Sequence, residues 1–426
     1  MWHFLYNLVF IPLLYFVFSI GKFFNNKIKI GFEGRENLFL ELESKLKNIE
    51  GEKRIWFHSS SLGEFEQAKP IISSIKKLFP NLKIIVTFFS PSGYLHAQNY
   101  KLADIISYIP VDSKNNAKRF LEMVNPILAI MIRYDVWPNF TWQANEKNIP
   151  LILVNGTFKD NSRRFFPLVQ TLHQQVFDCF SSIFTVSEND KNNFEKLKIT
   201  QPNIIANGDT RFDQVFERSL IAHTKHLLPT SITNGKIIFI AAQTWKEDEE
   251  VIFPVLAELH KKEPNLLTIV VPHEPTEDNL ERIENECENS ISNIRFSLLN
   301  AYNGESIIIV DSVGILIPLY QYCKIAYVGG SFRQGIHNVL EPAVFGLPII
   351  FGPTHLNSQE SVELKNIGGA FAISNSNEFS RIIKLLLTDD EKYNLAGNIS
   401  KNFIAAHRGA TERFTNYLFN ILETKL

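Results

Sequence analysis

Short runs of β-branched and aromatic residues alternate along most of the chain with polar stretches in which apolar residues recur every three or four positions. In the first half these runs predict strands at Arg54–Ser59, Lys83–Phe89, Ile105–Val111, Ile127–Ile132, Pro150–Val154, Ser182–Val186 and Asn203–Ala206. They resume at Lys236–Ala241, Leu266–Val271, Ser306–Val310, Ile325–Val328, Pro348–Phe351 and Ala370–Ile373. Helical stretches between most of them indicate parallel sheets with helices on both faces.

The pattern predicts two doubly wound, Rossmann-like α/β domains. At 426 residues the chain is too long for one ordinary core. We expect domains at 23–207 and 235–426, joined by a less regular linker at 208–234, with the last helix packing on either domain. Such domains bind ligands at the carboxyl ends of their strands, here along a cleft that the two domains face.

The amino terminus predicts a membrane anchor over residues 1–22. From Trp2 to Ile20 no residue is charged, and about 20 apolar residues cross a bilayer as a helix. Lys22, Lys27, Lys29 and Arg35 follow, which leaves the rest of the chain in the cytoplasm by the positive-inside rule. A buried first helix, or one lying in the membrane interface, is the alternative.

Composition narrows the class of protein. The net charge is −2 and no long basic tract occurs, so nucleic acid is not an expected partner. The hydrophobic share is 45%, as in a globular protein. Cys179, Cys287 and Cys323 are scattered and odd in number, which predicts a reducing compartment and no zinc site. No metal-ligand cluster stands out, so we expect no bound metal and no cofactor.

The segment HSSSLGEF (His58–Phe65) ends the first strand and starts a helix at the carboxyl edge of the first sheet. Glu64 is placed to accept a proton from an attacking hydroxyl, a role worth about 10²–10⁴-fold in rate. Ser61 and Glu64 also have the spacing of a capping box, in which the carboxylate only bonds the start of its own helix. Spacing alone leaves both interpretations open.

A second candidate lies in VGGSFRQGIHNVLEPAVFGLPIIFGP (Val328–Pro353), where a strand runs into Gly329 and Gly330. Paired glycines let a backbone approach a ligand closely. We expect a short helix from Asn338 whose amides face a phosphate, with Glu341 facing a ribose diol. The alternative is a plain helix cap. The dinucleotide GxGxxG pattern is absent from the sequence, which argues against a nicotinamide enzyme.

Three smaller candidates follow predicted strands. RYDVWPN (Arg133–Asn139) comes after the fourth strand, and GDTRFD (Gly208–Asp213) places Arg211 at the domain junction, where a cation could meet an anionic donor. His273 follows Pro272 at a strand end. A surface ion pair for Arg211 and simple packing for His273 are the alternatives.

Taken in order, HSSSLGE, the WPN of RYDVWPN, GDTRFD, GGSFRQGIHNVLEPA and IIFGP resemble the 3-deoxy-D-manno-octulosonic acid (Kdo) transferases of lipid A assembly. The resemblance runs from the anchor to near the last helix. It implies a GT-B fold, CMP-Kdo as donor, a lipid A precursor as acceptor, and a place on the cytoplasmic face of the bacterial inner membrane.

The resemblance also implies roles by position. Glu64 takes the place of the general base, Arg211 replaces a family lysine, Arg133 replaces a carboxylate and Asp135 matches a second acid. The implied CMP contacts are Pro272, His273, Val313, Gly314, Ile315, Gly330, Ser331, Asn338, Val339, Leu340 and Glu341. His273 stands where the family has arginine, and Ile315 where it has glutamate.

Two other functions stay open. One is a GT-B transferase or epimerase that uses a UDP-sugar. The other is a catalytically inactive, membrane-bound protein that binds a nucleotide sugar, which Arg133 and Ile315 favour.

Overall fold

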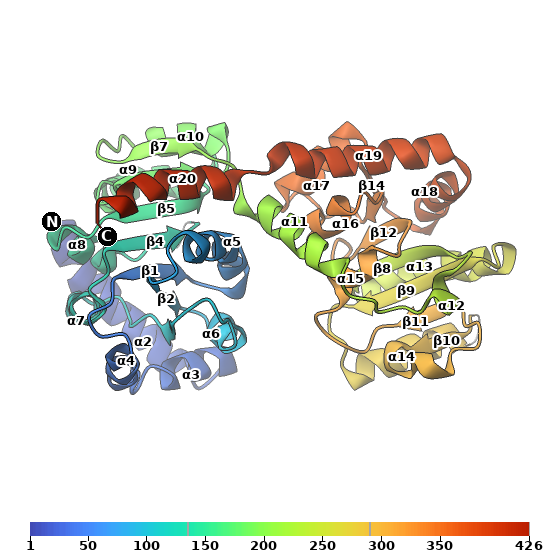
Figure 1. The fold of residues 1–426 in the computed structure, drawn as a ribbon, viewed down its shortest axis with the longest axis horizontal. Coiled ribbons are helices and arrows are strands. Elements are labelled where there is room, and N and C mark those ends of the chain that lie inside the picture. Colours follow the sequence, from blue (N-terminus) through green and yellow to red (C-terminus); the bar gives the residue numbers. More distant parts are fainter. Residues whose placement is uncertain (134–135, 289–290, 426) are drawn as a thin grey trace. The chain divides into compact units, whose positions relative to one another are not determined.

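A computed structural model describes residues 1–133, 136–288 and 291–425. The chain divides into two compact units (Figure 1). Unit 1 consists of Met1–Gln214 together with Arg408–Leu426, and unit 2 of Val215–His407. Each unit contains its own seven-stranded parallel sheet between layers of helices.

Unit 1 has the strand order β3-β2-β1-β4-β5-β6-β7. Its strands are β1 (Arg54–Ser59), β2 (Lys83–Phe88), β3 (Ile105–Tyr108), β4 (Leu128–Ile132), β5 (Leu151–Gly156), β6 (Ser182–Thr185) and β7 (Asn203–Ala206). Its helical segments are α1 (Trp2–Leu5), η1 (Tyr6–Phe10), α2 (Ile11–Gly21), α3 (Asn26–Glu33), α4 (Leu38–Lys47), α5 (Leu62–Leu78), α6 (Pro91–Ala97), α7 (Lys114–Val124), α8 (Pro138–Glu146), η2 (Arg163–Phe165), α9 (Pro167–Phe177), α10 (Glu188–Glu195) and α20 (Ala410–Glu423).

Unit 2 has the strand order β10-β11-β9-β8-β12-β13-β14. Its strands are β8 (Ile237–Thr244), β9 (Leu266–Pro272), β10 (Asn293–Arg295), β11 (Ile307–Ile309), β12 (Ile325–Val328), β13 (Ile349–Phe351) and β14 (Ala370–Ala372). Its helical segments are α12 (Thr230–Thr233), α13 (Lys246–Lys262), α14 (Glu277–Glu288), η3 (Phe296–Ala301), α15 (Leu316–Tyr320), α16 (Leu340–Val344), α17 (Gln359–Ile367), α18 (Ser376–Thr388) and α19 (Asp390–His407), while α11 (Thr210–Ala222) runs from unit 1 into unit 2.

The central strands are apolar throughout because both faces of each sheet are buried. In β1 the side chain of Trp56 packs on one face, against Phe120 and Phe140, while Ile55 and Phe57 join the core on the other face. A parallel sheet covered on both sides removes the polar alternation of a half-exposed strand. This burial explains why continuous apolar runs predicted the strands.

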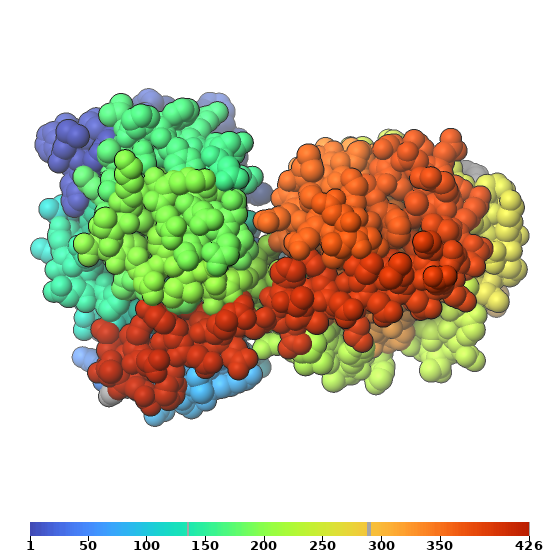
Figure 2. Space-filling view, turned by 90° about the horizontal axis from the view of Figure 1, so that it is seen from above, coloured from blue at the N-terminus to red at the C-terminus, as the bar shows by residue number. Residues whose placement is uncertain are grey.

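The C-terminal helix α20 packs on unit 1. Its buried Phe414, Leu418 and Leu422 join the core that α5 covers. Both chain ends therefore lie in unit 1 (Figure 1), and α20, in red, lies on the surface of that unit in Figure 2.

Two details differ from the sequence predictions. The stretch predicted as a less regular linker carries the 13-residue helix α11, because its buried Phe212, Val215 and Ala222 share one helical face among charged residues. The short strand β10 was not predicted, since its three residues are only half-buried at the sheet edge. The strands that were predicted are all present, with ends that shift by up to three residues.

The segment Trp2–Gly21 forms one continuous helical stretch, with a π-helical turn at η1, and is long and apolar enough to cross a membrane. It also makes polar contacts with the body of unit 1. The Trp2 indole donates to Thr171 Oγ1 (2.9 Å), and the Tyr6 hydroxyl donates to Asp112 Oδ2 (2.8 Å). The stretch therefore lies along unit 1 instead of projecting from it.

Asp112 is the buried group at this contact, and we expect it to make the stability of the fold depend on pH. Burial raises the pKa of its carboxyl to about 7, although it also accepts the amides of Asn139 and Phe140 at the start of α8. Because the pKa of Asp112 is higher in the folded than in the unfolded protein, Asp112 contributes fully to stability below about pH 4. This contribution is lost as the pH rises through 7. In the unsubstituted protein this titration should lower the unfolding free energy by on the order of 2–4 kcal/mol between low and high pH, and the Asp112→Asn variant should not show this decline.

Urea unfolding of both proteins between pH 4.5 and 8 measures this effect. The unfolding free energy of the unsubstituted protein should decline relative to that of Asp112→Asn as the pH rises. Parallel pH profiles would show that Asp112 titrates normally.

Candidate functional site

Glu64 lies in the first turn of α5, directly after β1, and is 6% exposed. Its Oε2 accepts the Ser61 amide (2.7 Å) and the Ser61 hydroxyl (3.0 Å), which completes a capping box. Its Oε1 makes no hydrogen bond within the described residues. The cap thus holds the carboxylate in place through one oxygen and leaves the other available for a ligand.

The HSSS loop is tied to the WPN motif by a buried histidine. His58, 1% exposed, accepts the Trp137 indole N–H at Nε2 (3.1 Å), so its Nδ1–H donates to Thr87 Oγ1 (3.0 Å). Burial lowers the pKa of His58 to about 3, so this ring stays neutral. His58 therefore orients Trp137 and serves as a structural group.

Arg133 follows β4, the direct neighbour of β1 in the sheet. Its backbone has a positive φ of 73°, and its amide donates to the Val154 carbonyl (2.7 Å). A non-glycine residue in this region is strained, which is common where a loop carries function. Asp135, the second predicted acid, lies outside the described residues.

Arg211 lies at the start of α11, and its guanidinium pairs with Asp209 (Nη2–Oδ2 2.6 Å). The residue before it, Thr210, donates its hydroxyl to the Gln67 carbonyl of α5 (2.8 Å). Asn155 at the end of β5 donates to both Thr210 Oγ1 (2.6 Å) and Gln67 Oε1 (3.0 Å). This buried junction fastens the GDTRFD segment to the helix that carries Glu64.

In unit 2 the paired glycines after β12 are required by close packing. A Cβ at Gly329 would lie 2.3 Å from the Gln243 carbonyl oxygen, and Gly330 has a φ of 92°. The buried carboxylate of Asp248 accepts the Gly330 amide (2.8 Å), the Trp245 amide (3.0 Å) and the Tyr327 hydroxyl (2.7 Å). Asp248 therefore holds the glycine loop at the carboxyl edge of the sheet.

Three rings stack beside this loop. The His273 ring lies 4.5 Å from Trp245 and 4.4 Å from His337, centroid to centroid, and Arg333 lies 4.0 Å over the Trp245 ring. The Trp245 indole donates to His337 Nε2 (3.2 Å), and burial lowers the pKa of His337 to about 4. The stack is thus an aromatic surface with one nearby cation, suited to a planar base and an anion.

The remaining predicted contacts lie near the carboxyl edge of the same sheet. Val313 and Gly314 lie between β11 and α15, where Val313 is 81% exposed, and Ile315 precedes α15. Pro272 ends β9, and Ser331 follows Gly330. Since β11, β9, β8 and β12 are consecutive in the sheet, these loops share one edge.

The predicted helix start at Asn338 is wrong by two residues. Helix α16 begins at Leu340 after Val339, and the Asn338 side chain accepts the Leu340 amide (3.1 Å). That amide is therefore not free for a phosphate, because the polar side chain before it already occupies it. Glu341 in this helix pairs with Arg218 (3.7 Å).

Buried hydroxyls without partners mark both edges. Within the described residues, four such buried atoms make no hydrogen bond. They are the Oγ atoms of Ser59 and Ser60 in unit 1, and Ser331 Oγ and Gln243 Oε1 in unit 2. Unpaired buried polar atoms are costly, so they commonly face a ligand or water. Each unit thus has such atoms beside its predicted site.

Several residues of these sites were missed from the sequence. Trp245 contacts His273, Asp248 contacts Gly330 and Arg333 contacts Trp245 across 28 to 88 residues of the chain, so no local motif joins them. His337 was quoted within a motif but given no role. The available signal was position alone, since Trp245 lies shortly after the strand predicted at Lys236–Ala241 and directly after the observed β8.

Comparison with known proteins adds to this geometry. A family model described as 3-Deoxy-D-manno-octulosonic-acid transferase (kdotransferase) matches residues 35–214. A 3-deoxy-D-manno-octulosonic acid transferase of Rickettsia bellii is 30% identical over 308 residues, covering 70% of this chain and 71% of the relative. One of Haemophilus influenzae is 27% identical over 375 residues, covering 87% of each.

Among solved structures, the UDP-GlcNAc 2-epimerase of Neisseria meningitidis bound to UDP-GlcNAc aligns with a TM-score of 0.60 at 16% identity, over 86% of this chain and all (100%) of that one. At that identity the likeness concerns the fold. It confirms the α/β, GT-B-like class of two doubly wound domains that the sequence predicts.

Proposed function

The chain belongs to the Kdo transferase family, and from this premise we propose that it moves Kdo from CMP-Kdo to a hydroxyl of a lipid A precursor at a membrane surface. It is a glycosyltransferase, as the resemblance in its motifs implied. The donor, the acceptor and the roles of single residues are the proposed part.

The proposal rests mainly on how the Glu64 carboxylate is held. Its carboxylate is fixed through Oε2, and the unpartnered hydroxyls of Ser59 and Ser60 precede it at the end of β1 and in the short loop before α5. A held carboxylate is a better base than a mobile one because its position costs no ordering during the reaction. The capping box and the general base are compatible roles of one side chain.

The proposed reaction forms a bond between the acceptor oxygen and the anomeric carbon of Kdo and breaks the bond from that carbon to the phosphate of CMP. Glu64 takes the proton of the acceptor hydroxyl, and CMP leaves with the bonding electrons. Positive charge builds on the sugar as the phosphate departs, as in glycoside hydrolysis. Arg211, paired with Asp209, is the proposed cation near the acidic donor.

For CMP we propose the carboxyl edge of the unit 2 sheet. The stack of Trp245, His273 and His337 offers a surface for a planar base, and the Ser331 hydroxyl offers a donor to a phosphate oxygen. Glu341 and the loop of Val313 to Ile315 complete the proposed contacts. His273 stacks where the family arginine would pair, so base recognition here depends more on ring contacts.

The direct test is purified protein with CMP-Kdo and a tetraacylated lipid A precursor, analysed by mass spectrometry. We expect the acceptor mass to rise by one or more Kdo residues, and no product from UDP-sugars. Turnover with a UDP-sugar alone would instead support the epimerase-like alternative, whose fold the chain shares.

We further propose that Trp2–Gly21 anchors the protein by lying in the membrane interface on the cytoplasmic side. A crossing helix carries its amino end about 30 Å away from the cytoplasmic domain. Trp2 and Tyr6, at that end, instead bond to unit 1, while Phe4, Leu8 and Phe16 are more than half exposed. An apolar outer face of this kind is typical of monotopic helices.

Cysteine labelling in intact cells distinguishes the two arrangements. With a Cys at position 5 (Leu5→Cys), an interfacial helix should give no reaction with a membrane-impermeant maleimide added outside the cells, and full reaction in inside-out vesicles. Labelling from outside would show that the helix spans the membrane.

A further inference from the structure

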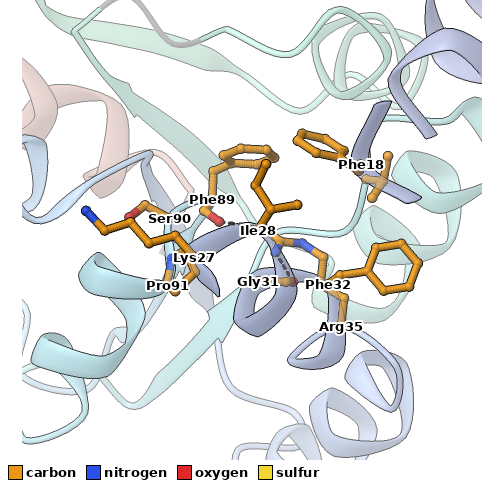
Figure 3. A pocket seen from close by; sticks show the side chains of 10 residues that line it. Phe18, Lys27, Ile28, Gly31, Phe32, Arg35, Phe89, Ser90 and Pro91 are labelled. Atoms are coloured by element: carbon orange, nitrogen blue, oxygen red, sulfur yellow. Dashed lines mark hydrogen bonds between the residues drawn. The ribbon is translucent and has the colours of Figure 1, made fainter. Parts of the chain in front are cut away.

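An apolar cavity lies in unit 1 where the end of α2, the helix α3 and the β2–α6 loop meet (Figure 3). Its volume is about 200 Å³, and its walls include Phe18, Ile28, Phe32, Phe89, Pro91 and Val111. An apolar cavity of about 150 Å³ already binds benzene in another protein. This one has room for several carbons of one alkyl chain.

Hydrogen bonds from Arg35 hold the segments around the cavity together without a ligand. Its guanidinium donates to the carbonyls of Ile109 (2.9 Å), Gly31 (2.5 Å) and Phe89 (2.7 Å), and it stacks on the Tyr108 ring at 4.6 Å. The dashed lines in Figure 3 mark its hydrogen bonds to Gly31 of α3 and to Phe89 of the β2–α6 loop. Burial lowers the pKa of Arg35 to about 10, so it is still charged at neutral pH.

The rim of the cavity carries basic side chains and exposed aromatic side chains. Lys27 lines the cavity and is exposed, and Lys22 lies over the Phe32 ring at 4.7 Å. Phe23 and Phe24, between α2 and α3, are 77% and 86% exposed. An apolar hollow beside lysines and exposed aromatic residues matches a lipid with an anionic head group.

One wall of the cavity is also joined to the loop of the proposed base. Ser90, which lines the cavity, donates its amide to the Ser60 carbonyl (2.8 Å), four residues before Glu64. The cavity thus lies between the apolar helix Trp2–Gly21, which contributes Phe18, and the proposed acceptor site. A lipid held here by its tail would present its head group on the side of Glu64.

We propose that this cavity seats one acyl chain of the acceptor, with Lys27 at its phosphorylated head group; the proposal rests on the proposed lipid-acceptor function. Each methylene that enters the cavity contributes to affinity because it leaves water. The pocket would therefore make acylation of the acceptor a determinant of its KM.

A substitution that fills the cavity tests this. Ile28→Trp places a larger side chain in the space, and Ile30→Trp is the matched control on the same helix, since Ile30 does not line the cavity. For a tetraacylated acceptor we expect Ile28→Trp to raise KM at least tenfold with kcat within twofold. For a deacylated acceptor of the same head group, and for Ile30→Trp with either acceptor, kcat/KM should stay within twofold.

Unchanged KM in Ile28→Trp, or equal losses on both acceptors, would overturn the proposal. Photolabelling with a phosphorylated lipid that carries a diazirine at the end of its acyl chain adds a second readout. Labels should fall on residues 18–35 and 85–97, and labels spread over other segments would also overturn it. If no acceptor turns over at all, the proposed function fails, and the label positions still decide whether the cavity binds an acyl chain.

Discussion

The Glu64→Gln variant should lose about 10²–10⁴-fold in kcat for Kdo transfer, which is the contribution of a positioned general base. The amide oxygen of glutamine can still accept the Ser61 amide, now bonded at 2.7 Å, so the start of α5 stays capped. The variant therefore removes the basic carboxylate and keeps the helix. The measurement is kcat at saturating CMP-Kdo together with the midpoint of urea unfolding.

Glu66→Gln is the matched control, since Glu66 lies on the same helix and pairs with Lys69 and Gln214 on another face. We expect its kcat to stay within a few-fold of the unsubstituted protein and its unfolding free energy within about 1 kcal/mol. If Glu64→Gln keeps full kcat, or loses activity only in proportion to unfolded protein, the carboxylate is a helix cap and no base.

The Asp248→Ala variant should lose on the order of 3 kcal/mol of unfolding free energy and most of its affinity for CMP. It leaves the amides of Gly330 and Trp245 and the hydroxyl of Tyr327 buried without their acceptor. A buried donor that loses its partner costs about 1–3 kcal/mol. Without that anchor the loop after β12 loses the position that presents Ser331.

Urea unfolding and isothermal titration with CMP measure the two effects. Glu250→Ala is the control two residues on in α13, because its carboxylate is exposed and only 3.8 Å from Lys246. An exposed pair of this kind contributes about 0–1 kcal/mol. Tight CMP binding by folded Asp248→Ala would show that the glycine loop holds its shape without the carboxylate.

The sequence by itself determined both sheets, because their strands are buried on both faces and read as continuous apolar runs. β1, β7 and β12 begin and end at the predicted residues. Two strands show where the sequence-based prediction fails. Strand β3 is shorter than predicted because Pro110 has no backbone N–H to donate. Strand β10 was not predicted because a half-buried edge strand has few apolar residues. The motifs around Glu64 and Gly330 were also visible, since each follows a strand directly.

The sequence could not decide between the cap and the base at Glu64, because both roles use the same local spacing of Ser61 and Glu64. Only the tertiary structure shows that the cap uses Oε2 alone, while Oε1 makes no hydrogen bond within the described residues.

Contacts between distant segments were decided by packing alone. His58 meets Trp137 across 79 residues and Asp248 meets Gly330 across 82. The acyl-chain cavity likewise joins α2, α3 and the β2–α6 loop through the buried guanidinium of Arg35. Local hydrogen bonds and apolar periodicity depend on residues close together in the sequence and can be predicted from it. A pocket forms only when separate elements pack against one another.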